Sequence, residues 1–467
     1  MTLAHVAQRS RLSSSPKDRA RSYSTLIGCW AVVCYRICLI TNSVTVAMLS
    51  QQNERDRMLS PYTVLDLCIG TEIIGARILG DLGANVISIE PPSGSPVRRM
   101  APFYKADPHK ERSLWWWAYA AGRRSITLDI ASTQGKILIK RLVRSADFLF
   151  ESFAPGYLSS LDLGYKTLSL LNPGLIMVSM TPFGQTGPYA SYSGPDIVGM
   201  ATGGFMHLTG DPDRAPIRVT VPQFGLHMGA SGATGAMIAH HHRLLTSEGQ
   251  YVDVSGQEAV SRTLSHAPSF WNLNQVNLSR QGVYRPGIGG GRSRTTWPCK
   301  DGYVNYALSA GPLGGGTNSL IQWMEEEGIH DEFLASVDWT QIDTNNEDGL
   351  GLMQKAAIPI QEFFMTKTKS ELYEAAVQRR VLLFPVNAPD DIYSEVQLAA
   401  RRYFQNIKHG AEGQSFEYPG SFIQSSGTSI TPMAPAPTLG EHNNQVYLGE
   451  LGFSTNDLVL LRQARVI

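Results

Sequence analysis

The regular alternation of short apolar runs with amphipathic stretches constrains the fold of this chain more than any other feature. Six runs have the length and apolar content of buried strands, and they lie at 64–67, 85–90, 123–129, 147–151, 175–180 and 251–254. Segments with helical spacing, such as 72–82 and 136–145, separate several of them. This pattern predicts an α/β fold with a largely parallel sheet, and such sheets bind ligands beyond the carboxyl ends of their strands.

Length and charge limit the classes of function. The chain has 467 residues, enough for two domains, and its 40 basic and 40 acidic side chains cancel. A neutral chain argues against a nucleic-acid partner held by bulk positive charge. The five cysteines have no C-x-x-C spacing, so neither a disulfide framework nor a metal site is expected.

The N-terminal extension, residues 1–59, differs from the rest of the chain. Residues 1–47 hold six Lys or Arg against one acid and are rich in serine, as mitochondrial transit peptides are. An alternative is an extension upstream of the true start at Met48 or Met58, which would leave a cytoplasmic or peroxisomal protein. The apolar run 26–40 is short for a membrane span and contains Arg36, which argues against a membrane partner.

A helix rich in glycine and alanine is predicted after residue 222. The run 229–236 has poor helix propensity, so we expect close packing to require its small residues. A β-rich segment, 217–221, is expected to lead into it. Because the first turn of a helix has free N–H groups, we expect an anionic ligand near Gly225.

Three other segments offer candidate ligand contacts. The loop 91–99 carries Arg98 and Arg99, which suit a phosphate but equally suit solvent. Glycines Gly289, Gly290 and Gly291 form a permissive loop that is interpreted as an active-site lid, with a linker as the alternative. The first β-α-β unit lacks G-x-G-x-x-G, so the sequence gives little support to a dinucleotide cofactor.

Several motifs together resemble the class III CoA-transferases, which include formyl-CoA and carnitine CoA-transferases and the related α-methylacyl-CoA racemases. The motifs are VLDL at 64–67, LGANVISIE at 82–90, GRRSITLD at 122–129, FAPG at 153–156, FGQTGP at 183–188, EGQYVDVS at 248–255, FPVN at 384–387 and APTLGEH at 436–442. The resemblance extends from about residue 60 to the C-terminus, and it rests on the order and spacing of the motifs.

The resemblance implies an architecture and a set of ligands. A Rossmann-like large domain would comprise 60–270 with 420–467, a smaller α/β domain would comprise 271–419, and two chains would form an interlocked homodimer. An acyl-CoA would be a substrate rather than a bound cofactor, and it would exchange CoA with a carboxylic acid in organic- or fatty-acid metabolism. Arg98, Arg99, Phe153 and Gly187 would contact CoA.

The chain departs from the family pattern at the reacting group. Transferases of this family attack the thioester with an aspartate just before the glycine-rich helix. Counting back from Gly249 and Gln250 places Gly225 at that position. The racemase motif Gly-His-Asp is replaced by Gly-Pro-Asp, ending at Asp196. Ser152 and Ser160 stand where the family has an asparagine and an arginine, so one CoA contact is also altered.

Three hypotheses follow. The chain transfers CoA, with the acceptor carboxylate attacking the thioester directly. Alternatively, it epimerises or isomerises an acyl-CoA, with His227 as the proton-transfer group; a histidine with a purely structural role is the other interpretation of that residue. The third hypothesis is an acyl-CoA-binding subunit without catalytic activity.

Overall fold

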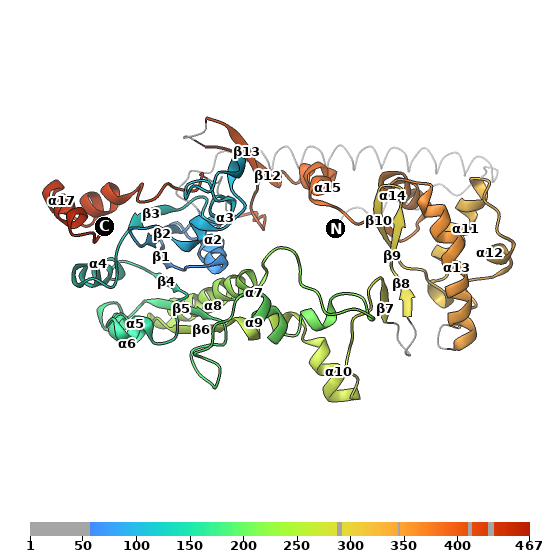
Figure 1. Cartoon of the computed structure of the whole chain (residues 1–467), viewed down its shortest axis with the longest axis horizontal. Helices are drawn as coiled ribbons and strands as arrows, with labels where there is room; N and C mark the ends of the chain where they lie inside the picture. Colours follow the sequence, from blue (N-terminus) through green and yellow to red (C-terminus); the bar gives the residue numbers. More distant parts are fainter. Residues whose placement is uncertain (1–56, 287–291, 344–345, 410–412, 428–433) are drawn as a thin grey trace, which may run out of the picture.

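The computed structural model describes residues 57–286, 292–343, 346–409, 413–427 and 434–467. Residues 1–56 of the predicted leader and the predicted lid glycines Gly289, Gly290 and Gly291 lie outside these ranges. Figure 1 shows a larger body, which holds the main sheet, and a smaller body, joined to it by two separate passages of chain. None of the helices in the described ranges is long and apolar enough to cross a membrane.

The large domain is built on a six-stranded sheet with all strands parallel. Its strands are β1 (Thr63–Leu67), β2 (Asn85–Glu90), β3 (Arg124–Thr127), β4 (Phe148–Glu151), β5 (Ile176–Thr181) and β6 (Tyr251–Ser255). The order β3-β2-β1-β4-β5-β6 reverses direction between β1 and β4. This is the doubly wound order, whose ligands lie at the carboxyl edge near the reversal. The parallel sheet predicted from the alternation of strands and helices is therefore confirmed.

Both faces of the sheet are covered, which is why the residues of β1, β2, β4 and β5 are almost all buried. One face packs against α2 (Ile74–Asp81) and α8 (Phe224–Thr246). The other face packs against α4 (Thr133–Val143), α6 (Tyr165–Leu171) and α17 (Thr455–Gln463). The C-terminal helix therefore completes the core of the large domain.

Shorter helices complete this domain. They are α3 (Leu114–Tyr119), α5 (Tyr157–Ser160), α7 (Asp196–Thr202), α9 (Gly256–Thr263), α10 (His266–Asn274) and a π-helix at Gln445–Glu450, with 3-10 turns at Thr71–Ile73, Pro96–Arg99, Tyr104–Ala106 and Met206–Leu208. The segment 217–221 is exposed and is not a strand, so that prediction was wrong. Its β-branched residues have no neighbouring strand to pair with, and strand propensity alone does not make a strand.

The small domain has a separate core around a three-stranded antiparallel sheet. Its strands are β9 (Thr296–Cys299), β10 (Gly302–Tyr306) and β11 (Leu383–Pro385), and its helices are α11 (Gly315–Glu326), α12 (Glu332–Ser336), α13 (Glu347–Met365) and α14 (Lys369–Arg379). Three fully buried tryptophans, Trp297, Trp323 and Trp339, fill this core. The predicted smaller α/β domain is confirmed.

The remaining elements lie between the two bodies or at their margins. They are the hairpin β7 (Tyr284–Pro286) and β8 (Arg292–Arg294), a 3-10 turn at Gly311–Leu313, helices α15 (Pro389–Ser394) and α16 (Val396–Ala400), and the hairpin β12 (Phe404–Lys408) and β13 (Ser415–Pro419). The sequence assigned β12 and β13 to the small domain. Their residues Ile407 and Tyr418 belong instead to the core of the large domain.

Candidate functional site

The first turn of α8 packs so closely on its neighbours that it needs glycine. A Cβ atom on Gly225 would lie 2.0 Å from Thr71 Oγ1, and one on Gly229 would lie 2.7 Å from the carbonyl oxygen of Glu72. The helix therefore approaches the turn after β1 almost backbone to backbone. The close packing expected from the glycine content is present, and the position aligned with the family's aspartate has no room for a side chain.

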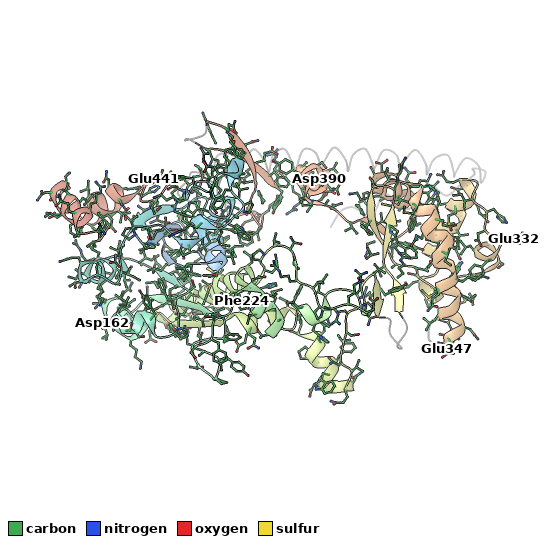
Figure 2. The ribbon with its side chains drawn as sticks, in the orientation of Figure 1. Asp162, Phe224, Glu332, Glu347, Asp390 and Glu441 are labelled. Carbon is green, nitrogen blue, oxygen red and sulfur yellow. The ribbon has the colours of Figure 1, made fainter. Side chains whose placement is uncertain are left out.

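The start of α8 is already occupied by an anionic group of the chain itself. The N–H groups of Gln223 and Phe224 donate to Asp196 Oδ1 over 2.7 and 2.9 Å. Arg218 lies 3.6 Å from the other carboxylate oxygen. The expected anionic ligand at this helix start is thus replaced by Asp196, which caps the helix. Figure 2 marks Phe224, the first residue of α8, at the end of the helix that lies toward the small domain.

His227 lies on the same first turn. It is half-buried, its ring centroid is 6.2 Å from that of Phe205, and burial lowers its pKa. A lowered pKa favours the neutral imidazole near pH 7, the form that can accept a proton. Among the described residues, no carboxylate bonds this ring, so nothing there orients it as a catalytic base.

An apolar pocket of about 400 Å³ adjoins this first turn. Gln223 and Leu226 line it from α8, and Trp115 and Tyr119 line it from α3, with their rings stacked 5.2 Å apart. No ionisable group other than Tyr119 is among its lining residues. A pocket of this size and polarity suits the uncharged part of a small molecule.

The two arginines predicted to bind phosphate are placed differently. Arg98 is fully buried, and its guanidinium bonds both oxygens of Glu90, one oxygen of Glu111 and the carbonyl oxygen of Pro437. It also stacks 3.9 Å from the centroid of the Trp116 ring. Its contacts are therefore structural. Arg99 is exposed and donates to the Gly94 carbonyl oxygen, so it is the arginine of this pair that a phosphate can reach.

The other predicted CoA contacts lie along the carboxyl edge of the sheet. Phe153 directly follows β4, and its N–H donates to Glu151 Oε2 over 2.8 Å. Gly187 lies in the loop after β5 with a φ of 96°, a conformation that favours glycine. At the reversal between β1 and β4, Ser152 Oγ accepts from the N–H of Ile69, and burial raises the pKa of Glu72.

Sequence reasoning missed the two residues that shape this site, Asp196 and Thr71. Asp196 was compared only with a racemase motif, although a carboxylate after Pro195 can also cap a helix distant in sequence. Its contact with Gln223 joins segments 27 residues apart. The contact of Thr71 with Gly225 joins segments much farther apart in the chain, and one sequence carries no signal for it.

The match to known proteins covers most of the chain. The model of CoA-transferase family III matches residues 59–443. The chain is 32% identical to the succinyl-CoA:(R)-benzylsuccinate CoA-transferase subunit BbsE of Thauera aromatica, over 87% of this chain and 98% of that protein. It is 30% identical to the succinyl-CoA–D-citramalate CoA-transferase of Chloroflexus aurantiacus, over 88% and 98%.

Comparison with solved structures identifies the same family. A CAIB/BAIF family protein from Brucella suis superposes with a TM-score of 0.71 at 28% identity, over 83% of this chain and 98% of that one. Sequence, fold and the doubly wound order of the sheet agree. The chain is a member of CoA-transferase family III.

Proposed function

We propose that this chain moves CoA from an acyl-CoA to a carboxylic acid, with a succinyl-CoA-like donor. The observation that carries the proposal is the family match over residues 59–443, together with relatives named as succinyl-CoA transferases. CoA is then a substrate, bound along the carboxyl edge of the sheet near Arg99, Phe153 and Gly187. In this assignment a homodimer is the working unit.

The closed position at Gly225 determines how the transfer proceeds. With no aspartate there, the acceptor carboxylate attacks the thioester carbonyl carbon itself, the C–S bond breaks, and CoA leaves as the thiolate. The product of this step is a free mixed anhydride of the two acids. The thiolate then attacks the acceptor-derived carbonyl, and the donor acid leaves as a carboxylate. No proton is gained or lost. The reaction is accelerated because the site holds the thioester and the acceptor carboxylate close together.

The apolar pocket beside α8 is a suitable binding site for the acyl group. Its lining of Trp115, Tyr119 and Leu226 takes an uncharged acyl or side-chain portion. Leu226 on the first turn of α8 forms one wall, so the thioester would lie beside this turn and not in the closed space at Gly225. Exclusion of water from such a pocket protects the anhydride from hydrolysis.

A panel assay tests this function. The purified chain is incubated with succinyl-CoA and separate carboxylic acids, and new acyl-CoA products are measured by mass spectrometry. We expect a new acyl-CoA to form with at least one acid, with release of succinate. If the assay instead shows deuterium entering the α-carbon of an acyl-CoA in heavy water, without transfer, proton-transfer chemistry replaces this proposal.

A second candidate function is favoured by the same glycine. A Cβ on Gly225 meets Thr71 at 2.0 Å, and the relative from Thauera aromatica is named as a subunit. The chain would then bind acyl-CoA beside a homologous chain that carries the aspartate. Transfer that appears only when such a homologue is added to the purified chain would distinguish this candidate from the first.

A further inference from the structure

A second pocket lies on the opposite face of the sheet from α8. It has a volume of about 580 Å³. Its floor contains Glu151, Met177, Ser179 and Tyr251 from three neighbouring strands. Met177 packs in the core on the α4 and α6 side, whereas α8 packs on the other side. The pocket is therefore separated by the sheet from the first turn of α8.

Strand register brings three polar residues together here. Glu151 of β4 is aligned with Ser179 of β5, and Ser179 is aligned with Asp253 of β6. Because aligned residues in a parallel sheet share a face, these side chains form a row across the strand ends. In this row Ser179 lies between Glu151, which lines the pocket, and Asp253, which lies outside the lining and accepts from the Gln185 N–H.

Glu151 is a deeply buried acid that lacks a cation. Its side chain is 4% exposed, and it forms no ion pair with any Lys, Arg or His of the described residues. The backbone N–H of Phe153 donates a hydrogen bond to the Glu151 carboxyl group. Buried acids in proteins are normally paired, because an unpaired charge out of water is costly. Burial first, and then the nearby Asp253 and Glu72, raise its pKa to about 7, against the opposing effect of the Ser179 hydroxyl and the Phe153 N–H.

Two more polar groups of this pocket lack an ordinary hydrogen bond. The Gln185 side-chain nitrogen has no hydrogen-bond partner among the described residues, and the fully buried Ser179 hydroxyl makes no hydrogen bond of ordinary geometry there, although it is near enough to Glu151 to lower the pKa of that acid. Both residues line the pocket. Most buried polar groups in proteins are satisfied, so this hydroxyl, beside an unpaired acid, indicates that a ligand completes the site.

The rest of the lining indicates the kind of ligand. Tyr165 and Tyr251 lie with ring centroids 5.5 Å apart at an interplanar angle of 30°, and tyrosine faces attract cations. The charged or titratable groups around Glu151 are Asp253 and Tyr251 on β6, Tyr165 and Lys166 on α6, and Glu72 after β1. Lys166 is exposed at the rim and forms no ion pair with Glu151. The acids outnumber this single cation.

We propose that this pocket binds a small organic cation, a primary ammonium group, whose charge pairs with Glu151 while Ser179 accepts one of its hydrogen bonds. One carboxyl group and one hydroxyl are too few oxygen ligands to hold a metal ion well, whereas an ammonium group can donate to both of them. The pocket adjoins the proposed CoA contact Phe153, but the pairing of a cation with Glu151 does not depend on the proposed transfer reaction.

Titration of the full chain with butylamine tests the proposal. The control ligands of similar size are 1-butanol, which is uncharged, and butyrate, which is an anion. Isothermal calorimetry at fixed salt is expected to show binding of butylamine alone at pH 8. Glu151 is about nine-tenths ionised at pH 8 and about one-tenth ionised at pH 6 for a pKa of about 7. The affinity should therefore be roughly tenfold lower at pH 6, although the amine keeps its charge.

Variants separate the site from general effects. Glu151→Gln is expected to abolish binding, and Lys166→Ala, at an exposed position, should strengthen it severalfold by removing a competing cation. Glu258→Gln, an exposed acid on α9 outside the pocket, should leave binding unchanged. Equal binding by Glu151→Gln and the parent would overturn the proposal. Preference for butyrate, or weaker binding by Lys166→Ala, would overturn it as well.

Discussion

Buried acids at the carboxyl edge of the sheet differ in whether a cation is paired with them. On the β1–β2 half, Asp66 is 2.5 Å from Arg123 and Glu90 is 2.6 Å from Arg98, and all four side chains are buried. Glu151 at the end of β4 and Glu72 in the turn after β1 are also buried, yet neither has a cation among the described residues. Burial alone therefore does not determine whether an acid of this edge is paired with a cation.

Breaking a pair on the β1–β2 half should have the largest effect. Arg98→Ala leaves Glu90 as a buried acid without its cation, and we expect the free energy of unfolding to fall by about 3–5 kcal/mol. Urea denaturation measures this loss. Arg99→Ala, the exposed neighbour, should change stability by less than about 0.5 kcal/mol and weaken acyl-CoA binding instead. Equal losses for the two variants would show that Arg98 has no special structural role.

Filling the closed position on α8 should come next. Gly225→Asp forces a side chain against Thr71 and buries a charge, so we expect a loss of about 2–4 kcal/mol in unfolding free energy. The matched control is Gly351→Asp, near the start of α13, where no neighbouring atom lies within 4 Å of the added Cβ. That control should stay within about 0.5 kcal/mol of the parent. A Gly225→Asp variant as stable as the control would contradict the closed geometry.

The unpaired Glu151 should make stability depend on pH. Its pKa of about 7 lies above the ordinary 4.5, so the folded state holds the proton more tightly than the unfolded state. Stability is then full below about pH 4.5 and falls as the pH rises toward 7, by roughly 3 kcal/mol in total. Glu151→Gln should remove this decline and be more stable than the parent at pH 8. A parent whose stability rises from pH 5 to 7 as steeply as that of the variant would contradict this.

Removing the cap of α8 should have the smallest effect. Asp196→Ala leaves the N–H groups of Gln223 and Phe224 without their acceptor, which costs about 1 kcal/mol. Asp196→Asn keeps a side-chain oxygen and should lose less. Thermal unfolding of the two variants measures the difference. Equal unfolding temperatures for the alanine and asparagine variants would mean that the hydrogen bonds of this cap do not stabilise the helix.

The sheet could be predicted because its determinants are local. The run 85–90 has three β-branched apolar residues, and Gly83 and Pro91 bound it, so β2 matches its predicted limits. The segment 217–221 has similar residues but no partner strand, and a single sequence does not reveal which runs will find one. The assignment of the hairpin β12–β13 to the small domain failed for a related reason. Its apolar residues pack on Tyr104 and Trp117, about 300 residues earlier in the chain.

The candidate site was predictable only in part. The family motifs located α8 and the glycine in place of an aspartate, which are properties of sequence order. The contact between Thr71 and Gly225, the cap by Asp196 and the row of Glu151, Ser179 and Asp253 are properties of packing and register. Arg98 and Arg99 are adjacent and alike in sequence, and only the fold assigns one to the interior and the other to solvent.

Intact-mass spectrometry of the purified chain during CoA transfer tests the central claim most directly. The chain is incubated with succinyl-CoA, with and without an acceptor acid, and both the protein mass and the acyl-CoA products are recorded. We predict transfer to the acceptor with no acyl or CoA adduct on the protein, because Gly225 offers no carboxylate. A protein whose mass increases by bound CoA during turnover would contradict this account.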